Sequence, residues 1–177
     1  MGTGIILCGL NGAGKSILGR ALAEKLDFHF IDSEELFFPG TDPDHPYANP
    51  RTRKEAEKLL LERIRAHGSF VLASVKGNYG EVVTSRIQYA VIIDVSREIR
   101  MQRVKSRSFD KFGGRMLPGG DLYEQEERFF DFAASRDERI VEEWIQTLSC
   151  PVIRVDGTRP ALENVELIRD FLPATVR

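Results

Sequence analysis

Short apolar runs alternate with longer amphipathic stretches along this chain of 177 residues. The runs have the length of buried strands, and the stretches place apolar residues at helical spacing. The predicted strands are Ile5–Cys8, Phe28–Ile31, Phe70–Val75, Tyr89–Val95 and Pro151–Val155. The predicted helices cover residues 16–26, 52–66, 97–107, 123–147 and 162–171. Strands that alternate with helices are typical of a parallel sheet covered on both faces. The pattern therefore predicts an α/β fold with three layers, α/β/α, around a five-stranded parallel sheet.

A glycine-rich segment follows the first predicted strand. It reads Gly-Leu-Asn-Gly-Ala-Gly-Lys-Ser, the G-x-x-x-x-G-K-S pattern of the Walker A phosphate-binding loop, or P-loop. A strand before the motif and a helix after it form the context that the motif requires, which argues against a chance glycine turn. In such a loop the glycines let backbone N–H groups approach phosphate oxygens closely, and the helix N-terminus attracts the anion.

The P-loop predicts a nucleoside triphosphate, which we expect to be ATP, together with Mg²⁺. Lys15 would reach the β- and γ-phosphates, and the hydroxyl of Ser16 would bind Mg²⁺. The predicted nucleotide-binding positions in the loop are Gly9, Asn11, Gly12, Ala13, Gly14, Lys15 and Ser16.

Composition excludes several other classes of protein. A net charge of −2 argues against a general nucleic-acid binder. No apolar run has the length of a membrane span, and the N-terminal residues lack the pattern of a signal peptide. Cys8 and Cys150 form no C-x-x-C pair, so two reduced structural thiols are expected. We expect a cytoplasmic single-domain protein over residues 1–177, and the sequence does not indicate its oligomeric state.

Positive charge gathers after the fourth predicted strand. From Arg97 to Arg115 there are seven basic and two acidic residues, and paired glycines flank a short insert around Arg115. A basic helix that leads into a glycine-hinged insert suits a lid over phosphates, here at about 108–121. The alternative is a solvated basic helix face, balanced by the acidic helix that follows.

The order of these segments resembles the nucleoside-monophosphate-kinase-like P-loop kinases, which include adenylate, shikimate and gluconate kinases. Besides the P-loop, the resemblance rests on Phe30-Ile31-Asp32-Ser33-Glu34, on Arg103 and Arg107 before the lid, and on Asp156-Gly157-Thr158-Arg159-Pro160. It spans nearly the whole chain. It implies a P-loop NTPase fold with a short arginine-bearing lid, and transfer of the γ-phosphoryl of Mg-ATP to a small-molecule or nucleotide acceptor.

The resemblance also implies residue roles. Arg103 and Arg107 match the arginine pair that contacts the transferred phosphoryl in adenylate kinases, and Arg115 lies within the lid. Gly157 and Arg159 match the loop that flanks the adenine. Asp32 and Glu34 resemble the Asp-x-Asp of shikimate kinases, which handles metal-bound water and the acceptor hydroxyl. The implied catalytic residues are Lys15, Asp32, Arg103, Arg107 and Arg115, and the implied metal-binding residues are Ser16 and Asp32.

The acceptor side is less well defined by the sequence. It comprises a helical region at about 33–68 and the segment after the third predicted strand. Lys76 follows that strand, where acceptors bind in the family, so it indicates an anionic acceptor or is a surface lysine. Tyr47, Arg51 and Arg53 flank the acceptor-side helix and would clamp a phosphate or carboxylate, or else belong to a solvated helix start. The candidate acceptor-binding residues are Asp32, Glu34, Arg51, Arg53, Lys76, Gly77 and Arg136. Whether Asp32 or Glu34 acts as a base stays open.

A second class of function also fits the P-loop. A nucleotide-binding NTPase or switch protein would bind the same nucleotide without a small-molecule acceptor. Its acidic Walker B residue would follow an apolar strand, as Asp94 does after Ile92 and Ile93. The compact lid favours the kinase, for which we expect a nucleoside triphosphate and a small anionic acceptor as partners, with no nucleic acid and no membrane.

Overall fold

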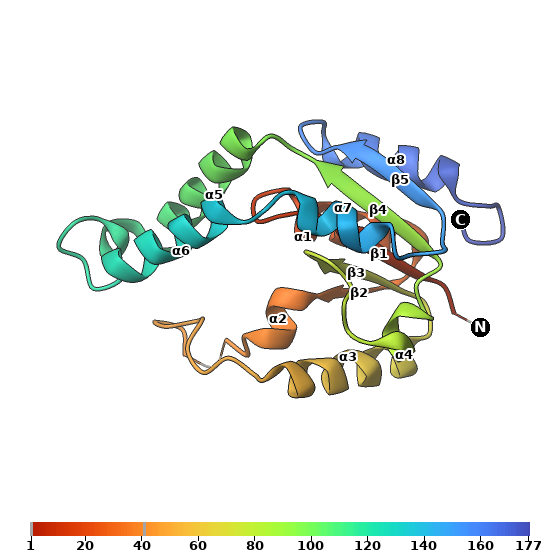
Figure 1. Ribbon diagram of the computed structural model, residues 1–177, viewed down its shortest axis with the longest axis horizontal. Helices are drawn as coiled ribbons and strands as arrows, with labels where there is room; N and C mark the ends of the chain where they lie inside the picture. The colour runs from red at the N-terminus through yellow and green to blue at the C-terminus, as the bar shows by residue number, and fades with distance from the viewer. Residues whose placement is uncertain (1, 41) are drawn as a thin grey trace.

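Five parallel strands form the central sheet, in the order β2-β3-β1-β4-β5. The computed structural model describes residues 2–40 and 42–177 (Figure 1). The strands are β1 (Gly4–Cys8), β2 (His29–Asp32), β3 (Phe70–Ser74), β4 (Tyr89–Asp94) and β5 (Val152–Asp156). β1 lies in the middle of the sheet, between β3 and β4. The predicted five-stranded parallel sheet is confirmed.

Helices cover both faces of this sheet (Figure 1). The helices are α1 (Lys15–Leu26), α2 (Ser33–Phe37), α3 (Arg53–His67), α4 (Glu81–Thr84), α5 (Arg97–Phe112), the 3₁₀ turn η1 (Gly113–Met116), α6 (Tyr123–Ser135), α7 (Arg139–Ile145) and α8 (Ala161–Phe171). In the described part of the chain, none of these helices combines the length and the hydropathy needed to cross a membrane.

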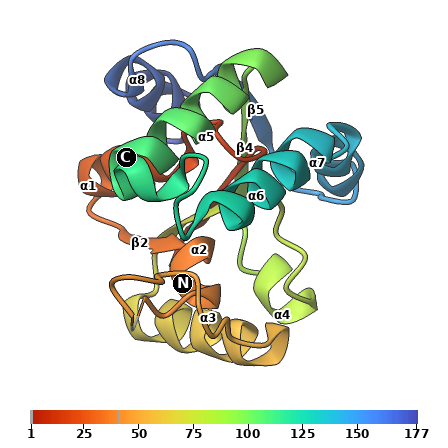
Figure 2. The same ribbon diagram turned by 90° about the vertical axis from the view of Figure 1, so that its left-hand side faces the viewer.

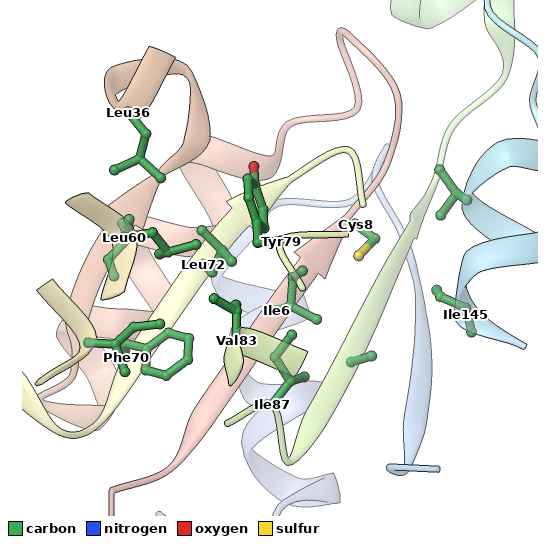
Figure 3. Packing of buried hydrophobic residues seen from close by; sticks show 14 of the residues in the cluster. Ile6, Cys8, Leu36, Leu60, Phe70, Leu72, Tyr79, Val83, Ile87 and Ile145 are labelled. Carbon is green, nitrogen blue, oxygen red and sulfur yellow. The ribbon is translucent and has the colours of Figure 1, made fainter. Parts of the chain in front are cut away.

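The two sides of β1 build two separate cores. Ile5 and Leu7 face one side, where they pack in a cluster with residues of α1 and α8. Ile6 and Cys8 face the other side, where α3, α4 and α7 contribute to the cluster. Figure 3 shows this second cluster, with Ile145 of α7 at one end. Because successive side chains of a strand point to opposite faces, a strand that is apolar throughout requires helices on both.

α3 shows how the sequence defines a helix of this outer layer. Thr52 accepts a hydrogen bond from the N–H of Glu55, whose carboxylate accepts one from the N–H of Thr52, so a capping box begins the helix. Its buried residues Ala56, Leu60 and Ile64 recur every four positions and form one apolar stripe. The predicted helix at 52–66 agrees with this element.

Two predicted boundaries are wrong. The stretch 123–147 is not one helix, because α6 ends at Ser135 and Arg136 adopts an extended conformation. Asp137 accepts hydrogen bonds from the backbone and side chain of Arg139, and this local bonding competes with helix continuation. The predicted helix 97–107 is also too short, since α5 continues to Phe112.

The lid is more ordered than the glycine pairs suggest. Its first part belongs to α5, and its glycine-rich centre contains the η1 turn. An apolar cluster ties α5, η1 and α6 together. Its buried members are Val104, Phe112, Met116, Leu122 and Phe130. The sequence predicted a loop here. It did not indicate the cluster, because the members come from separate segments and form no contiguous pattern.

Candidate active site

A cavity of about 1340 Å³ lies at the carboxyl edge of the sheet. Its walls come from the P-loop, from the ends of β2 and β3, from the 45–48 segment, and from α5, α6 and the start of α8. Figure 2 shows α5 and α6 next to one another on one side, with α2 and α3 on the other. Ligands of open α/β sheets bind at this edge, where the connecting loops converge.

The P-loop conformation depends on its glycines. Gly12 and Gly14 have φ values of 83° and 95°, a region that other residues rarely adopt. A Cβ atom at Gly12 would lie 2.3 Å from the carbonyl oxygen of Arg100, so no side chain fits there. Gly9 lies beneath the loop, where an added Cβ would lie 2.9 Å from the Cβ of Ala13. The loop, followed directly by the N-terminus of α1, therefore fits a phosphate chain.

Lys15 is poised for an anion. Its Nζ donates to the carbonyl oxygen of Leu10 at 3.1 Å, which folds the side chain over the loop. Desolvation in the cleft lowers its pKa to about 8, against the opposing attraction of Asp32. The positive charges of Arg136 and Arg107 lower the pKa further. A triphosphate placed among these cations would reverse the shift, because the opposite charge favours the protonated amine.

Ser16 and Asp32 form a paired oxygen site below the phosphate position. The hydroxyl of Ser16 donates to Asp32 Oδ2 at 2.5 Å. Asp32 Oδ1 accepts from the backbone N–H of Glu34 at 2.9 Å and so caps α2. Mg²⁺ prefers oxygen ligands and takes one or two from the protein, with phosphate oxygens and water completing its shell. The two side chains therefore fit Mg²⁺ in the presence of a nucleotide.

Three arginines surround the P-loop. Arg103 donates to the carbonyl oxygens of Gly12 at 3.5 Å and of Gly157 at 3.0 Å, so it joins the P-loop to the 157–159 segment. Arg136 donates to Asn11 Oδ1 at 3.0 Å, and Arg107 also lines the cavity. The break between α6 and α7 is what brings Arg136 to this position.

Arg115 lies apart from these arginines. It donates to both carboxylate oxygens of Asp121, at 3.0 and 2.7 Å, and to the carbonyl oxygen of Asp44 at 3.3 Å. It is not among the residues that line the cavity in the described structure. The structure thus brings Arg103 and Arg107 together in the cavity wall and holds Arg115 between the lid and the 44–47 segment.

The predicted acceptor residues divide into two groups. Asp32, Glu34, Arg53 and Lys76 line the cavity with Arg136. Arg51 instead donates to the carbonyl oxygens of Glu35 and Leu36, which satisfies acceptors near the end of α2.

Gly77 belongs to the packing beneath the cavity. A Cβ atom there would lie 2.7 Å from both the Cδ1 of Ile6 and the ring of Trp144. Its small size therefore serves the contact between β1 and α7.

The segment after β5 forms one end of the cavity. Gly157 and Arg159 both line it. A Cβ atom at Gly157 would lie 3.0 Å from the carbonyl oxygen of Ala13, so this segment packs directly on the P-loop. The structure therefore puts the predicted base-flanking residues beside the predicted phosphate site.

Sequence reasoning missed a buried arginine. Arg100 is 3% exposed and donates to Glu138 at 2.8 Å, to the carbonyl oxygen of Val95 at 3.3 Å and to that of Asn11 at 3.4 Å. It ties α5 and the start of α7 to the P-loop. Arg100 lies three positions before Arg103 and seven before Arg107, so the three side chains lie on one helix face. This spacing could have indicated from the sequence that Arg100 belongs to the site.

Of the aromatic residues that line the cavity, the sequence indicated only Tyr47, as a clamp for the acceptor. Tyr47 donates to Glu34 at 3.1 Å and accepts from Lys111 at 3.3 Å, so it links the carboxylate to the lid. Burial, followed by the charge of Glu34, raises the pKa of Tyr47 to about 12. The other aromatic residues that line the cavity are Phe37, Phe38, Tyr79, Phe129 and Phe132. Nothing in the sequence indicated the contact between Tyr47 and Lys111, because the two residues are 64 positions apart.

Asp94, the candidate Walker B residue, has a different role. It pairs with Arg154 of β5 at 3.1 Å and is not among the residues that line the cavity. Its carboxylate therefore joins two neighbouring strands.

Comparisons with known proteins agree with this geometry. The family model described as "AAA domain" matches residues 5–113, more than half of the chain. The chain is 26% identical over 176 residues to the uncharacterized protein YqaC of Bacillus subtilis (strain 168), covering 95% of this chain and 96% of that protein. It is 29% identical to the shikimate kinase of Synechococcus sp. (strain RCC307), over 68% of this chain and 63% of that protein.

A solved structure shares the fold. The shikimate kinase from Acinetobacter baumannii, in complex with shikimate, superposes with a TM-score of 0.60 at 20% identity, covering 97% of this chain and 93% of that chain. The resemblance stated from the sequence is confirmed. The chain belongs to the AAA-domain family and has the fold of the nucleoside-monophosphate-kinase-like P-loop kinases.

Proposed function

We propose that this protein transfers the γ-phosphoryl group of Mg-ATP to a hydroxyl group of a small anionic acceptor. The observation that carries the proposal is that one cavity joins the P-loop to two carboxylates, Asp32 and Glu34, and to the arginines of α5, Arg103 and Arg107. Phosphoryl transfer asks mainly for positioning and for charge stabilisation, which this arrangement offers.

On the nucleotide side, the backbone of the P-loop and Lys15 would hold the phosphates. Mg²⁺, held by Ser16 and Asp32, would neutralise charge on the β- and γ-phosphates. Arg103 and Arg107 would stabilise the charge that spreads over the transferred group. Arg159 would flank the base with Gly157.

On the acceptor side, a hydroxyl fits better than a phosphate. Two carboxylates beside the transfer position would repel an anionic phosphate acceptor, whereas they accept a hydroxyl hydrogen. Both oxygens of Asp32 are engaged, by Ser16 and by the N–H of Glu34. We therefore assign the orientation and deprotonation of the hydroxyl to Glu34, which Tyr47 steadies at 3.1 Å.

The negative charge of the acceptor would meet Lys76 and Arg53. Both line the cavity beyond the carboxylates. Arg53 pairs with Glu57 at 2.8 Å and also donates to the carbonyl oxygen of Asn78, so Lys76 is the stronger candidate. Arg51 is left out of this role, because its guanidinium is engaged by α2.

The switch function is the weaker candidate, because Asp94 pairs with Arg154 rather than facing the cavity. The two functions differ in whether ADP release depends on an acceptor. A coupled assay should be run with ATP alone and with pools of hydroxylated carboxylates, sugar phosphates and nucleosides. Acceptor-dependent ADP release, absent from Lys15→Met, supports the kinase. ADP release that no pool changes would contradict it.

A further inference from the structure

A tyrosine joins the lid to the proposed base. Tyr47 lines the cavity, and its hydroxyl donates to Glu34 Oε1 at 3.1 Å while it accepts from Lys111 Nζ at 3.3 Å. Lys111 belongs to the last turn of α5, whereas Glu34 belongs to the first turn of α2. The three side chains therefore form a chain of two hydrogen bonds that runs from the lid to the acceptor side of the cavity.

The ring of Tyr47 is also held from both sides. It packs edge-on against Phe38, which follows α2, with the ring centroids 5.3 Å apart, and edge-on against Phe112 at the end of α5 at 6.5 Å. It packs on the buried apolar cluster of the lid as well. The ammonium group of Lys111 lies 4.4 Å from the centroid of the Tyr47 ring, within the range of a cation–π contact. The position of the hydroxyl thus depends on where the lid lies.

Glu34 has little else to hold its carboxylate. It is exposed on a helix of five residues, and within residues 2–40 and 42–177 the hydroxyl of Tyr47 supplies the only hydrogen bond to its carboxylate oxygens. A long side chain without a partner spreads over several rotamers, and fixing it in one of them costs entropy. A general base must lie within hydrogen-bond reach of the proton that it removes. The orientation of the proposed base therefore depends on Tyr47.

A second contact fixes the same segment to the lid. Arg115 in η1 donates to the carbonyl oxygen of Asp44 at 3.3 Å, three residues before Tyr47. α5 also carries Arg103 and Arg107 in the cavity wall. One helix and the turn that follows it therefore hold both the arginines of the nucleotide side and the support of the base.

We propose that Lys111 and Tyr47 are positioning residues that hold Glu34 in place for the acceptor hydroxyl, and that they do so only while the lid lies against the 44–47 segment. The hydroxyl proton stays on Tyr47, which donates it in a hydrogen bond to one oxygen of Glu34. The other oxygen takes the proton of the acceptor hydroxyl. This inference rests on the proposed function, because it assigns the support of the proposed base.

The test separates turnover from binding. Tyr47→Phe keeps the ring and its packing but removes both hydrogen bonds. With the acceptor found in the coupled assay, we expect kcat to fall by about tenfold, a part of the usual contribution of a general base, while ATP affinity stays within about twofold of the parent value. Lys111→Met should lower kcat by about threefold, the scale of one hydrogen bond. Circular dichroism of each variant controls for folding.

The two residues should act as one unit. In the Tyr47→Phe background, Lys111→Met should cause no further loss of kcat, because the hydroxyl that Lys111 contacts is already absent. Lys105→Met is the matched control. It removes another lysine of α5, whose ammonium lies 5.6 Å from the centroid of the Phe130 ring in the lid cluster, and should leave kcat unchanged.

An unchanged kcat in Tyr47→Phe would overturn the inference and leave its contacts as packing alone. Normal turnover in Lys111→Met, or an additive loss in the double variant, would remove the dependence on the lid. A loss of ATP affinity equal to the loss of kcat would assign the pair to binding and contradict the inference as well. If no acceptor pool changes ADP release from the parent protein, the proposed function fails and the inference falls with it. If transfer occurs and the variants are normal, the inference alone fails.

Discussion

Lys15 sits among charges that act on it in opposite directions. Desolvation, Arg136 and Arg107 oppose its protonation, whereas Asp32 favours it. The residue is therefore held ready for a ligand that brings negative charge, and near neutral pH its contribution should appear mainly in the ligand-bound states.

Replacement of Lys15 by Ala should leave the fold intact and reduce turnover by about two to three orders of magnitude, the scale of losing one preorganised charge contact. Steady-state rates at saturating ATP, with circular dichroism as the control for folding, measure this. Equal rates for the variant and the parent protein would remove Lys15 from the catalytic machinery.

ATP affinity should fall as the pH rises through about 8, the pKa of Lys15. Above that pH the free protein loses the proton that the complex needs, so the dissociation constant should rise by up to about tenfold per pH unit. The pKa of Tyr47, at about 12, lies outside this window. Titration with a fluorescent nucleotide from pH 7 to 9.5 measures the effect, and Lys15→Met should show no slope there.

The same shift has a consequence for stability. The folded pKa is depressed below the ordinary value of 10.5, so between about pH 8 and 10.5 the unfolded chain binds more protons than the folded one. The free energy of unfolding therefore gains a contribution that increases with pH across this window. In the ligand-free protein, Lys15→Met should remove that contribution, as urea unfolding at several pH values would detect.

At the scale of elements, the lid joins three parts of the molecule. α5 carries Arg100 into the P-loop, Arg103 to the 157–159 segment and Arg107 into the cavity. Lys111 at the far end of α5 and Arg115 of the following η1 turn contact the 44–47 segment. Movement of this helix would therefore change the nucleotide side and the acceptor side together.

Arg107 should act on transfer more than on ATP affinity. A contact that is completed as charge spreads over the transferred phosphoryl affects kcat more than ground-state binding. In Arg107→Ala we expect single-turnover transfer to fall by at least about tenfold more than ATP affinity does. Losses in equal proportion would assign it a binding role only, and unchanged transfer would exclude it.

Arg115 provides the matched comparison within the lid. Its exposed pairing with Asp121 should contribute little stability, because water and salt screen the attraction between exposed charges. The sequence-based prediction that it joins the transferred phosphoryl requires it to leave Asp121 when the lid closes. Arg115→Ala then lowers transfer without changing ATP affinity, whereas normal transfer would restrict Arg115 to its contacts with Asp121 and Asp44.

At the scale of the whole molecule, local sequence predicts the sheet and the P-loop because both depend on short, contiguous patterns. It does not predict contacts made between distant segments. Arg51 was expected at the acceptor but binds the carbonyl groups of α2, and Arg100 reaches the P-loop from a helix that begins 81 positions after Ser16.

The predicted site residues divide in the same way, into those that contiguous sequence patterns define and those whose position depends on contacts with distant segments. Residues within or next to the P-loop motif, and the arginines one helical turn apart, line the cavity together. Arg115 and Gly77 do not line the cavity in the described structure. Arg115 is held by its ion pair, and Gly77 is surrounded by tightly packed side chains. Their predicted roles depended on the family resemblance, which gives no information on such partners.

The central claim is that the phosphoryl group leaves ATP for an organic molecule. Incubation with ATP labelled in the γ-phosphoryl group, with and without the acceptor pool that stimulates ADP release, and separation of the products test it most directly. We predict that the label appears in an organic phosphate with the parent protein and is absent from that product with Lys15→Met and Glu34→Gln. Label found only in inorganic phosphate, whatever pool is added, would contradict the account.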